Sequence, residues 1–179
     1  MKPSSRPLAF ALAALGAAAG CNGAAASSDA SAASDGAAPA GVPERPPRGQ
    51  KAIEAWLAQG HYRTAPWRCE QGISPARGNG AHGRTRVCSN DLVFVGDSGP
   101  FPAGAASVKE MYDADDRSNG YAVGLKIAPG DGDATWYWYE RGGTSPTSQP
   151  VADGVGVEEC GPRCHKAAPR DNVYVRAPP

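Results

Sequence analysis

The chain has 179 residues and a mass of 18.4 kDa, which leaves room for one domain or at most two small ones. Eighteen basic residues balance eighteen acidic ones, and this zero net charge argues against a non-specific nucleic-acid binder. The 23 glycines and 17 prolines disfavour an all-helical bundle, and the five cysteines cannot all pair with one another.

Residues 1–20 have the pattern of an export signal. Lys2 and Arg6 precede a short apolar run over residues 8–19, which is too short to span a bilayer. The small residues LGAAAG lead directly into Cys21. This resembles the lipobox of bacterial lipoproteins, in which the cysteine is diacylated and becomes the new N-terminus. The alternative is an ordinary cleavage site followed by an incidental cysteine.

The next segment, residues 21–50, is predicted to be a disordered linker behind the acylated cysteine. Between positions 22 and 50 there are nine Ala, four Ser, four Gly and four Pro but no aromatic residue, so little apolar surface is available to offset the entropy of ordering. Loss of the signal leaves 16 basic against 18 acidic residues. We therefore expect an extracytoplasmic protein held to a bacterial membrane, by preference the outer one, through acyl chains alone.

The remaining residues, 51–179, hold twelve of the thirteen aromatic residues, enough for one modest core. Apolar residues at helical spacing predict one short helix over residues 51–57 that ends before Gly60. Beyond it the pattern predicts strands at 92–95, 106–112, 121–127 and 135–139, and a Gly/Ser/Thr/Pro-rich loop from 141 to 155. The expected fold is α+β and mainly β, an antiparallel sheet with one or two short helices.

Two of these strands give the most secure structural prediction. Residues 121–127 alternate, so Tyr121, Val123, Leu125 and Ile127 share one face. The turn signal PGDGD at 129–133 then leads into the aromatic run TWYWY, which predicts an antiparallel pair. Within the strand at 106–112, the same alternation places Ser107, Lys109 and Met111 on one face.

Cys69 and Cys88 are predicted to form a disulfide. In an oxidising compartment, closing a loop of about twenty residues stabilises a fold by about 3 kcal/mol in the chain-entropy estimate. The residues between them are of types common in loops. His82 lies in this segment, and an exposed loop histidine is the simpler interpretation than a haem or metal ligand; the same holds for His61.

Near the C-terminus, residues 159–166 read ECGPRCHK. Two cysteines followed at once by a histidine are what covalent c-type haem attachment requires, with Cys160 and Cys164 joined to the haem vinyl groups and His165 ligating the iron. The usual spacing has two residues between the cysteines, whereas this chain has three. A Cys160–Cys164 disulfide with a surface His165, or a zinc site with two ligands still to be found, are the alternatives.

Three blocks of sequence resemble the cytochrome P-460 family and its relatives, the beta-type cytochromes c-prime. The first is FPAGAASVKEMY at 101–112, and the second is GYAVG at 120–124 with WYWY at 136–139. The third is the ECGPRCHK block with RDNVYV at 170–175. The resemblance covers most of residues 80–179 and implies a haem-binding domain at 51–179 with one covalent haem c per chain.

The resemblance also implies roles for two further residues. A lysine at the place of Lys109 forms an additional bond to the haem in P-460 members, which accompanies hydroxylamine oxidation; the c-prime relatives lack it and bind small gaseous ligands. Arg86, or Arg84, stands loosely where family members carry a distal arginine. The alternatives are a solvent-facing lysine and surface arginines in a strand. We assign no distal carboxylate, although Glu110 and Glu140 are present.

The functional expectation is a lipid-anchored mono-haem protein that performs redox or ligand chemistry on hydroxylamine or nitric oxide. Its expected partners are a small nitrogenous ligand or substrate, a redox protein, a membrane through the lipid anchor only, and no nucleic acid; a homodimer is a family expectation. A plain electron-transfer cytochrome is one alternative. A non-enzymatic lipoprotein, a β domain with two disulfides that binds a surface partner, is the other.

Overall fold

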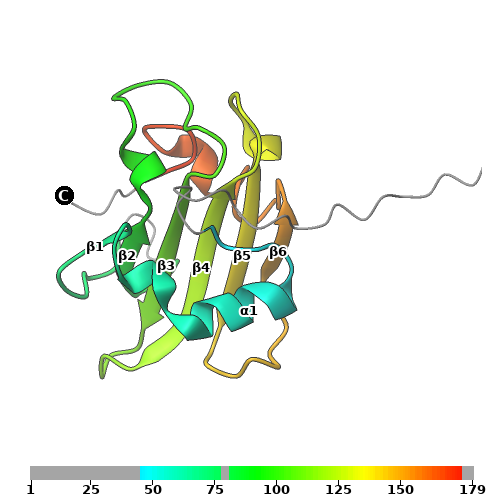
Figure 1. Cartoon of the computed structure of the whole chain (residues 1–179). Coiled ribbons are helices and arrows are strands. Elements are labelled where there is room, and N and C mark those ends of the chain that lie inside the picture. The colour runs from blue at the N-terminus through cyan, green and yellow to red at the C-terminus, as the bar shows by residue number, and fades with distance from the viewer. Residues whose placement is uncertain (1–44, 78–80, 175–179) are drawn as a thin grey trace, which may run out of the picture. The chain divides into compact units, whose positions relative to one another are not determined.

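The computed structural model describes residues 45–77 and 81–174 (Figure 1). The predicted signal at 1–20, the lipidation site Cys21 and most of the predicted linker lie outside these residues. Among the described residues, no helix has both the length and the apolar character needed to cross a membrane.

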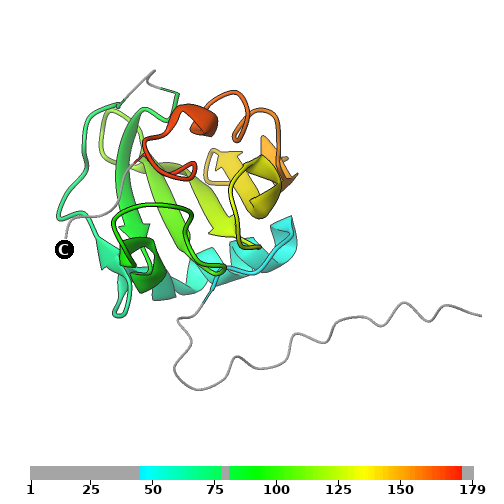
Figure 2. The same cartoon turned by 90° about the horizontal axis from the view of Figure 1, so that it is seen from above.

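A six-stranded antiparallel sheet forms the centre of the fold, with each strand hydrogen-bonded to the next along the chain. This confirms the expected α+β, mainly β class. In Figure 2 the sheet lies between two layers, with helix α1 on one face and the C-terminal segment on the other. The strands are β1 (Arg68–Cys69), β2 (Arg84–Ser89), β3 (Ala106–Tyr112), β4 (Ser118–Lys126), β5 (Trp136–Gly142) and β6 (Ala152–Val155).

The single α-helix, α1 (Gln50–Gln59), confirms the predicted helix and begins one residue earlier. It ends where Gly60 adopts a left-handed conformation, φ 72°, and its N–H donates to the carbonyl of Leu57. The buried face of the helix consists of Ile53, Trp56 and Leu57. Burying each such side chain stabilises by about 2 kcal/mol, which holds the helix on the sheet.

The alternation predicted for β3 and β4 is confirmed, and it divides the core in two. Val108 on β3, with Val123 and Leu125 on β4, packs in the cluster that α1 covers. A second cluster around Phe101, Trp136 and Trp138 lies apart from it. The predicted disulfide is also present, because the β1–β2 register places Cys69 directly opposite Cys88.

Two predicted segments are wrong. Residues 92–95, expected as a strand, include a short 3-10 helix at Asp91–Phe94. The buried Asn90 ends β2 because its side chain bonds the Gly104 carbonyl at 2.8 Å and the Ala106 amide at 3.1 Å, so the chain turns there. The expected loop after Arg141 contains β6, which pairs with β5 despite its glycine.

Candidate functional site

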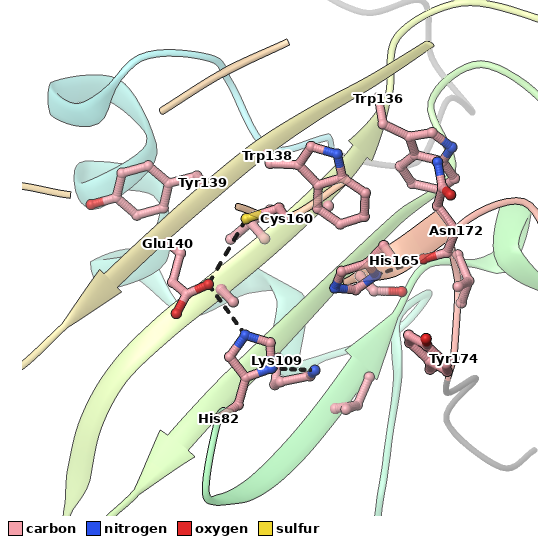
Figure 3. A pocket seen from close by; sticks show the side chains of 16 residues that line it. His82, Lys109, Trp136, Trp138, Tyr139, Glu140, Cys160, His165, Asn172 and Tyr174 are labelled. Carbon is pink, nitrogen blue, oxygen red and sulfur yellow. Dashed lines mark hydrogen bonds and ion pairs between the residues drawn. The ribbon is translucent and has the colours of Figure 1, made fainter. Parts of the chain in front are cut away.

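A cavity of about 60 Å³ lies on the face of the sheet opposite α1 (Figure 3). Its floor is made by small residues of the two central strands, Ser107 on β3 with Ala122 and Gly124 on β4. A larger, adjoining cavity shares four of its lining residues, namely His82, Lys109, His165 and Tyr174. Short side chains at the centre of a sheet leave room above it, so the strand pattern itself creates the space.

The aromatic wall of the cavity depends on one glycine. Gly124 pairs with Trp138 in the β4–β5 register, and a Cβ at position 124 would lie 2.8 Å from Trp138 Cζ3. The indole therefore rests against the strand where only a glycine leaves space for it. Trp136 stacks on Trp138, with ring centroids 5.5 Å apart.

The two C-terminal cysteines lie on one turn of the chain beside the cavities. The Cys164 amide donates to the Cys160 carbonyl at 3.2 Å, and the His165 amide donates to the same oxygen at 2.7 Å. Both thiols are free, so the alternative of a second disulfide is not what the structure shows. Cys160 is buried and lines the smaller cavity, whereas Cys164 lines the larger, adjoining one. Burial, together with the charge of Glu140, raises the pKa of the Cys160 thiol to about 12.

His165 lines both cavities, and one of its ring nitrogens takes part in a hydrogen bond. Its Nδ1 is 2.7 Å from the carbonyl oxygen of Asn172, and because a carbonyl only accepts, Nδ1 carries the proton and donates. The Nε2 atom of the neutral ring then keeps its lone pair, and in Figure 3 it points away from Asn172 into the open space. The ring lies 4.3 Å from that of Trp138, and burial lowers the His165 pKa to about 4.

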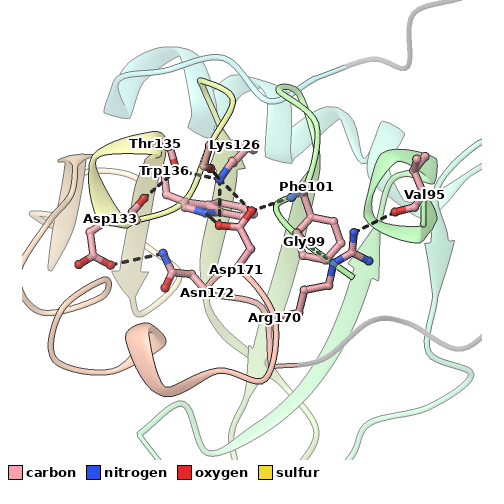
Figure 4. Close-up of polar contacts among 12 residues, drawn as sticks. Val95, Gly99, Phe101, Lys126, Asp133, Thr135, Trp136, Arg170, Asp171 and Asn172 are labelled. Atoms are coloured by element: carbon pink, nitrogen blue, oxygen red, sulfur yellow. Dashed lines mark hydrogen bonds and ion pairs between the residues drawn. The ribbon is translucent and has the colours of Figure 1, made fainter. Parts of the chain in front are cut away.

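The acceptor for His165 is held by a buried ion pair one residue earlier in the chain (Figure 4). Lys126 Nζ lies 2.7 Å from Asp171 Oδ2, and both side chains are almost completely buried. Asp171 also accepts from the Trp136 indole at 3.1 Å and the Phe101 amide at 2.7 Å. These bonds fix the C-terminal segment on the sheet.

The adjacent Arg170 ties the same segment to the loop that precedes β3. Its guanidinium donates to four backbone carbonyls, those of Val95, Gly96, Ser98 and Gly99. It also lies over the Phe101 ring, 4.0 Å from the centroid. The position of His165 is therefore set by the sheet and by this loop together.

Across the cavity from the Asn172 bond, three polar side chains form a continuous hydrogen-bonded chain (Figure 3). Lys109 Nζ lies 2.8 Å from His82 Nδ1, and His82 Nε2 lies 3.2 Å from Glu140 Oε2. The Cys160 sulfur approaches the same carboxylate oxygen at 3.9 Å. The three residues come from β3, from the segment before β2, and from β5.

Burial and nearby charges have opposite effects on the pKa values of Lys109 and Glu140. Burial lowers the Lys109 pKa, and the nearby charge of Glu140 offsets only part of that effect. Burial alone would raise the Glu140 pKa, but the hydrogen bond and charge of His82 and the charge of Lys109 outweigh it, so the net pKa is lowered. The carboxylate is thus ionised at neutral pH, and its bond to His82 assigns the imidazole proton to Nε2.

The structure brings together four of the predicted site residues: Lys109, Cys160, Cys164 and His165. Arg86, the further residue of the prediction, lies away from the cavity. In the β2–β3 register Arg86 faces Glu110, to which its Nε donates at 2.7 Å, while Val87 turns toward the cavity. Arg84 points the same way as Arg86 and pairs with Asp116 at the edge of the sheet.

Sequence reasoning missed Glu140 and undervalued His82. A signal for Glu140 was available, because it follows Trp136 and Trp138 at strand spacing and so shares their face. His82 lies in an irregular segment with no periodicity to place it, and only the folded chain shows its two partners. Asn172 acts through its backbone carbonyl, which no side-chain pattern reveals.

No group of three or more His, Cys, Asp or Glu side chains within residues 45–77 and 81–174 is arranged to hold a metal ion. The zinc alternative for the C-terminal cysteines therefore finds no complete set of ligands in that part of the chain. No family model, no curated protein and no solved structure matches the chain.

Proposed function

We propose that this chain is a lipid-anchored, extracytoplasmic c-type haem protein with one covalent haem. Cys160 and Cys164 would carry the thioether bonds, and His165 would ligate the iron. The observation that carries the proposal is the His165 hydrogen bond to Asn172. Histidines that ligate metals commonly donate their other ring N–H to a carbonyl or carboxylate, which fixes the ring and leaves the second nitrogen free.

The donor set suits haem better than a bare metal ion. The porphyrin supplies its own in-plane nitrogens, so the protein needs to provide only an axial ligand and two thiols. Cys160 and Cys164 are unpaired and adjoin the cavities that His165 lines. Small floor residues and the Trp138 indole offer a flat apolar surface beside them.

When bound, the haem iron supplies reversible electron transfer and a coordination position for a small ligand such as hydroxylamine or nitric oxide. His82 is a poor candidate for the second axial ligand, because both of its ring nitrogens already take part in hydrogen bonds. This favours ligand or redox chemistry over a plain electron carrier. Lys109 lines both cavities, and its amine would face the group.

The anchor and partners complete the proposal. Cys21 would carry the acyl chains, and these alone would hold the protein to the membrane. A redox protein would exchange electrons with the haem. Pairing of two copies follows from the resemblance alone.

The experiment is an absorption spectrum of the full chain after export in a bacterial host with working haem-attachment machinery. A red protein whose pyridine haemochrome spectrum is that of thioether-linked haem is the expected result. The matched control, Cys160→Ala with Cys164→Ala, should lose the covalent haem. A colourless wild-type protein from the same host contradicts the proposal.

A further inference from the structure

The two buried or half-buried lysines of the described domain have different kinds of partner. Lys126 is bonded to the Asp171 carboxylate, the Gly130 carbonyl and the Thr135 hydroxyl, which together hold an ammonium group in place. Lys109 is bonded instead to an imidazole nitrogen, 2.8 Å away. A neutral imidazole is a base, so this contact does not neutralise an ammonium charge as a carboxylate does.

The tautomer of His82 follows from the geometry. Glu140 is an ionised acceptor, so His82 Nε2 carries the proton and donates to it. His82 Nδ1 then has a free lone pair, and Lys109 Nζ is the donor to it. A nucleophile, a base within hydrogen-bond reach and a third group that orients the base make up the arrangement that activates nucleophiles in covalent catalysis.

The position of Lys109 gives the amine access to a ligand. It lines both the cavity of about 60 Å³ and the adjoining larger one of about 430 Å³. The walls nearby are apolar and aromatic, with Val87, Trp138 and Tyr174 among them. A desolvated amine at the boundary of such a space is the environment in which lysines form imines with carbonyl compounds.

We propose that Lys109 is a nucleophilic amine, with His82 as its base and Glu140 as the carboxylate that orients His82, and that it binds a small aldehyde or ketone as an imine. The inference requires no haem and therefore goes beyond the function proposed above. Burial, which lowers the pKa of Lys109, enlarges the fraction of free amine at neutral pH.

The reaction balances without an oxidant or a reductant. The Nζ lone pair forms a bond to the carbonyl carbon, the π electrons move to oxygen, and His82 Nδ1 takes the proton that nitrogen loses. Glu140 stabilises the imidazolium. His82 then returns this proton to the oxygen, which gives the neutral carbinolamine. A second proton, from solvent, lets the hydroxyl group leave as water while the nitrogen lone pair forms the C=N bond of the protonated imine.

The test compares lysines within one protein. The full-length chain, as isolated, is treated with propanal and cyanoborohydride near pH 7, and the modified lysines are identified by peptide mass spectrometry. We expect Lys109 to be alkylated at least about tenfold faster than the exposed Lys51 and Lys166, since its amine is free and has a positioned base. Equal or slower modification of Lys109 overturns the inference.

Two variants test the roles of the partners. His82→Gln should slow the alkylation of Lys109 by about tenfold or more, while the alkylation rates of Lys51 and Lys166 stay the same. Glu140→Gln removes a negative charge that favours the ammonium form, so the Lys109 rate should reach half its maximum at a lower pH. A purely structural role for Glu140 would not move that profile, and an unmoved profile contradicts its assignment.

The pH profile depends on every charged or titratable group near the amine. The groups that line its cavities or act on its charge are His82, Glu140, Cys160, His165, Arg77 and Glu70. The haem proposal and this inference can fail separately. A colourless protein in which Lys109 is alkylated fast refutes only the haem proposal. A red protein in which Lys109 is unreactive refutes only the proposal of a nucleophilic amine.

Discussion

Two glutamates on opposite faces of the sheet differ in their surroundings and hence in what they can do. Glu110 is 1% exposed and accepts from four side chains, those of Tyr62, Arg63, Arg86 and Tyr112, each at 2.7 Å. Glu140 faces the cavity and has one such hydrogen-bonded partner, His82, besides its long contact with Cys160. A carboxylate that already accepts four hydrogen bonds stabilises the fold, whereas a carboxylate with a single imidazole donor can orient that imidazole as a base.

Glu110→Ala should lower the free energy of unfolding by about 3 kcal/mol, because it leaves the buried Tyr62 hydroxyl and the Arg86 guanidinium without their acceptor. Burial alone would raise the Glu110 pKa, but the hydrogen bonds from Tyr112 and Tyr62 and the charge of Arg63 lower it overall. The stabilisation is therefore present above the unfolded-state pKa and is lost as the pH falls through the lower folded-state pKa.

Urea unfolding at neutral and acidic pH measures both effects. Asp115→Ala, at an exposed carboxylate, is the matched control and should be nearly neutral. If Glu110→Ala is as stable as that control at neutral pH, the structural role of Glu110 is refuted.

Gly124→Ala should destabilise the fold by about 1–3 kcal/mol, since the new methyl group would lie 2.8 Å from the Trp138 ring and force it to shift. The cavity wall would move with it, so tryptophan fluorescence should change as well. Gly142→Ala on the neighbouring strand meets nothing within 4 Å and serves as the control. Equal melting temperatures for the two variants would contradict this account of the wall.

At the scale of elements, the C-terminal segment after β6 positions the site although its one helix is a short 3-10 turn at His165–Ala167. It carries Cys160, Cys164 and His165, and the described part is attached to the sheet through Asp171 and to a loop through Arg170. Asp171 and Asn172 both adopt positive φ, 37° and 65°, which turns the Asn172 carbonyl toward His165. The site is built by anchoring an irregular segment, and helix α1 takes no part in it.

Asp171→Ala should cost about 3–5 kcal/mol, because it leaves Lys126 buried without its counter-ion. Amide hydrogen exchange across residues 157–174 should rise with it. Replacing Lys126 by Met in the same chain removes the unpaired charge and should recover much of the loss. An Asp171→Ala protein that keeps wild-type stability and exchange would show that the ion pair does not hold the segment.

The regular elements were predictable because their signals are local. Helix α1 and strands β3, β4 and β5 follow from apolar spacing, and the PGDGD turn sets the β4–β5 pair. Residues 92–95 were predicted to be a strand because a short apolar run is equally consistent with a 3-10 turn. The hydrogen bonds of the Asn90 side chain, which end the preceding strand, decide between the two. Strand β6 has little pattern of its own and forms by pairing with β5.

The site residues that belong to a sequence motif could be predicted, whereas those that only the folded chain brings together could not. The cysteines and His165 stand together in sequence, and Lys109 was placed through its strand. Glu140 and His82 are 58 residues apart and meet only in three dimensions. Arg86 lies away from the cavity because adjacent strand residues face opposite ways and Val87 lines the cavity.

At the scale of the whole molecule, the sheet separates structure from the proposed chemistry. One face packs against α1 and holds Glu110, and the other holds the cavities, the Lys109–His82–Glu140 chain and the C-terminal cysteines. The five cysteines accordingly divide into three uses. Cys69 and Cys88 form the disulfide, and Cys160 and Cys164 are free. Under the proposed function, Cys160 and Cys164 would hold haem and Cys21 would carry lipid.

The most direct test of the central claim is peptide mass spectrometry of the chain exported from a haem-attaching host. We predict that the peptide containing residues 160–165 carries the mass of one haem on its two cysteines. The same peptide should lose that mass in the Cys160→Ala, Cys164→Ala variant. A wild-type peptide that carries free thiols or an internal disulfide, from a host that loads a control cytochrome, would contradict the claim.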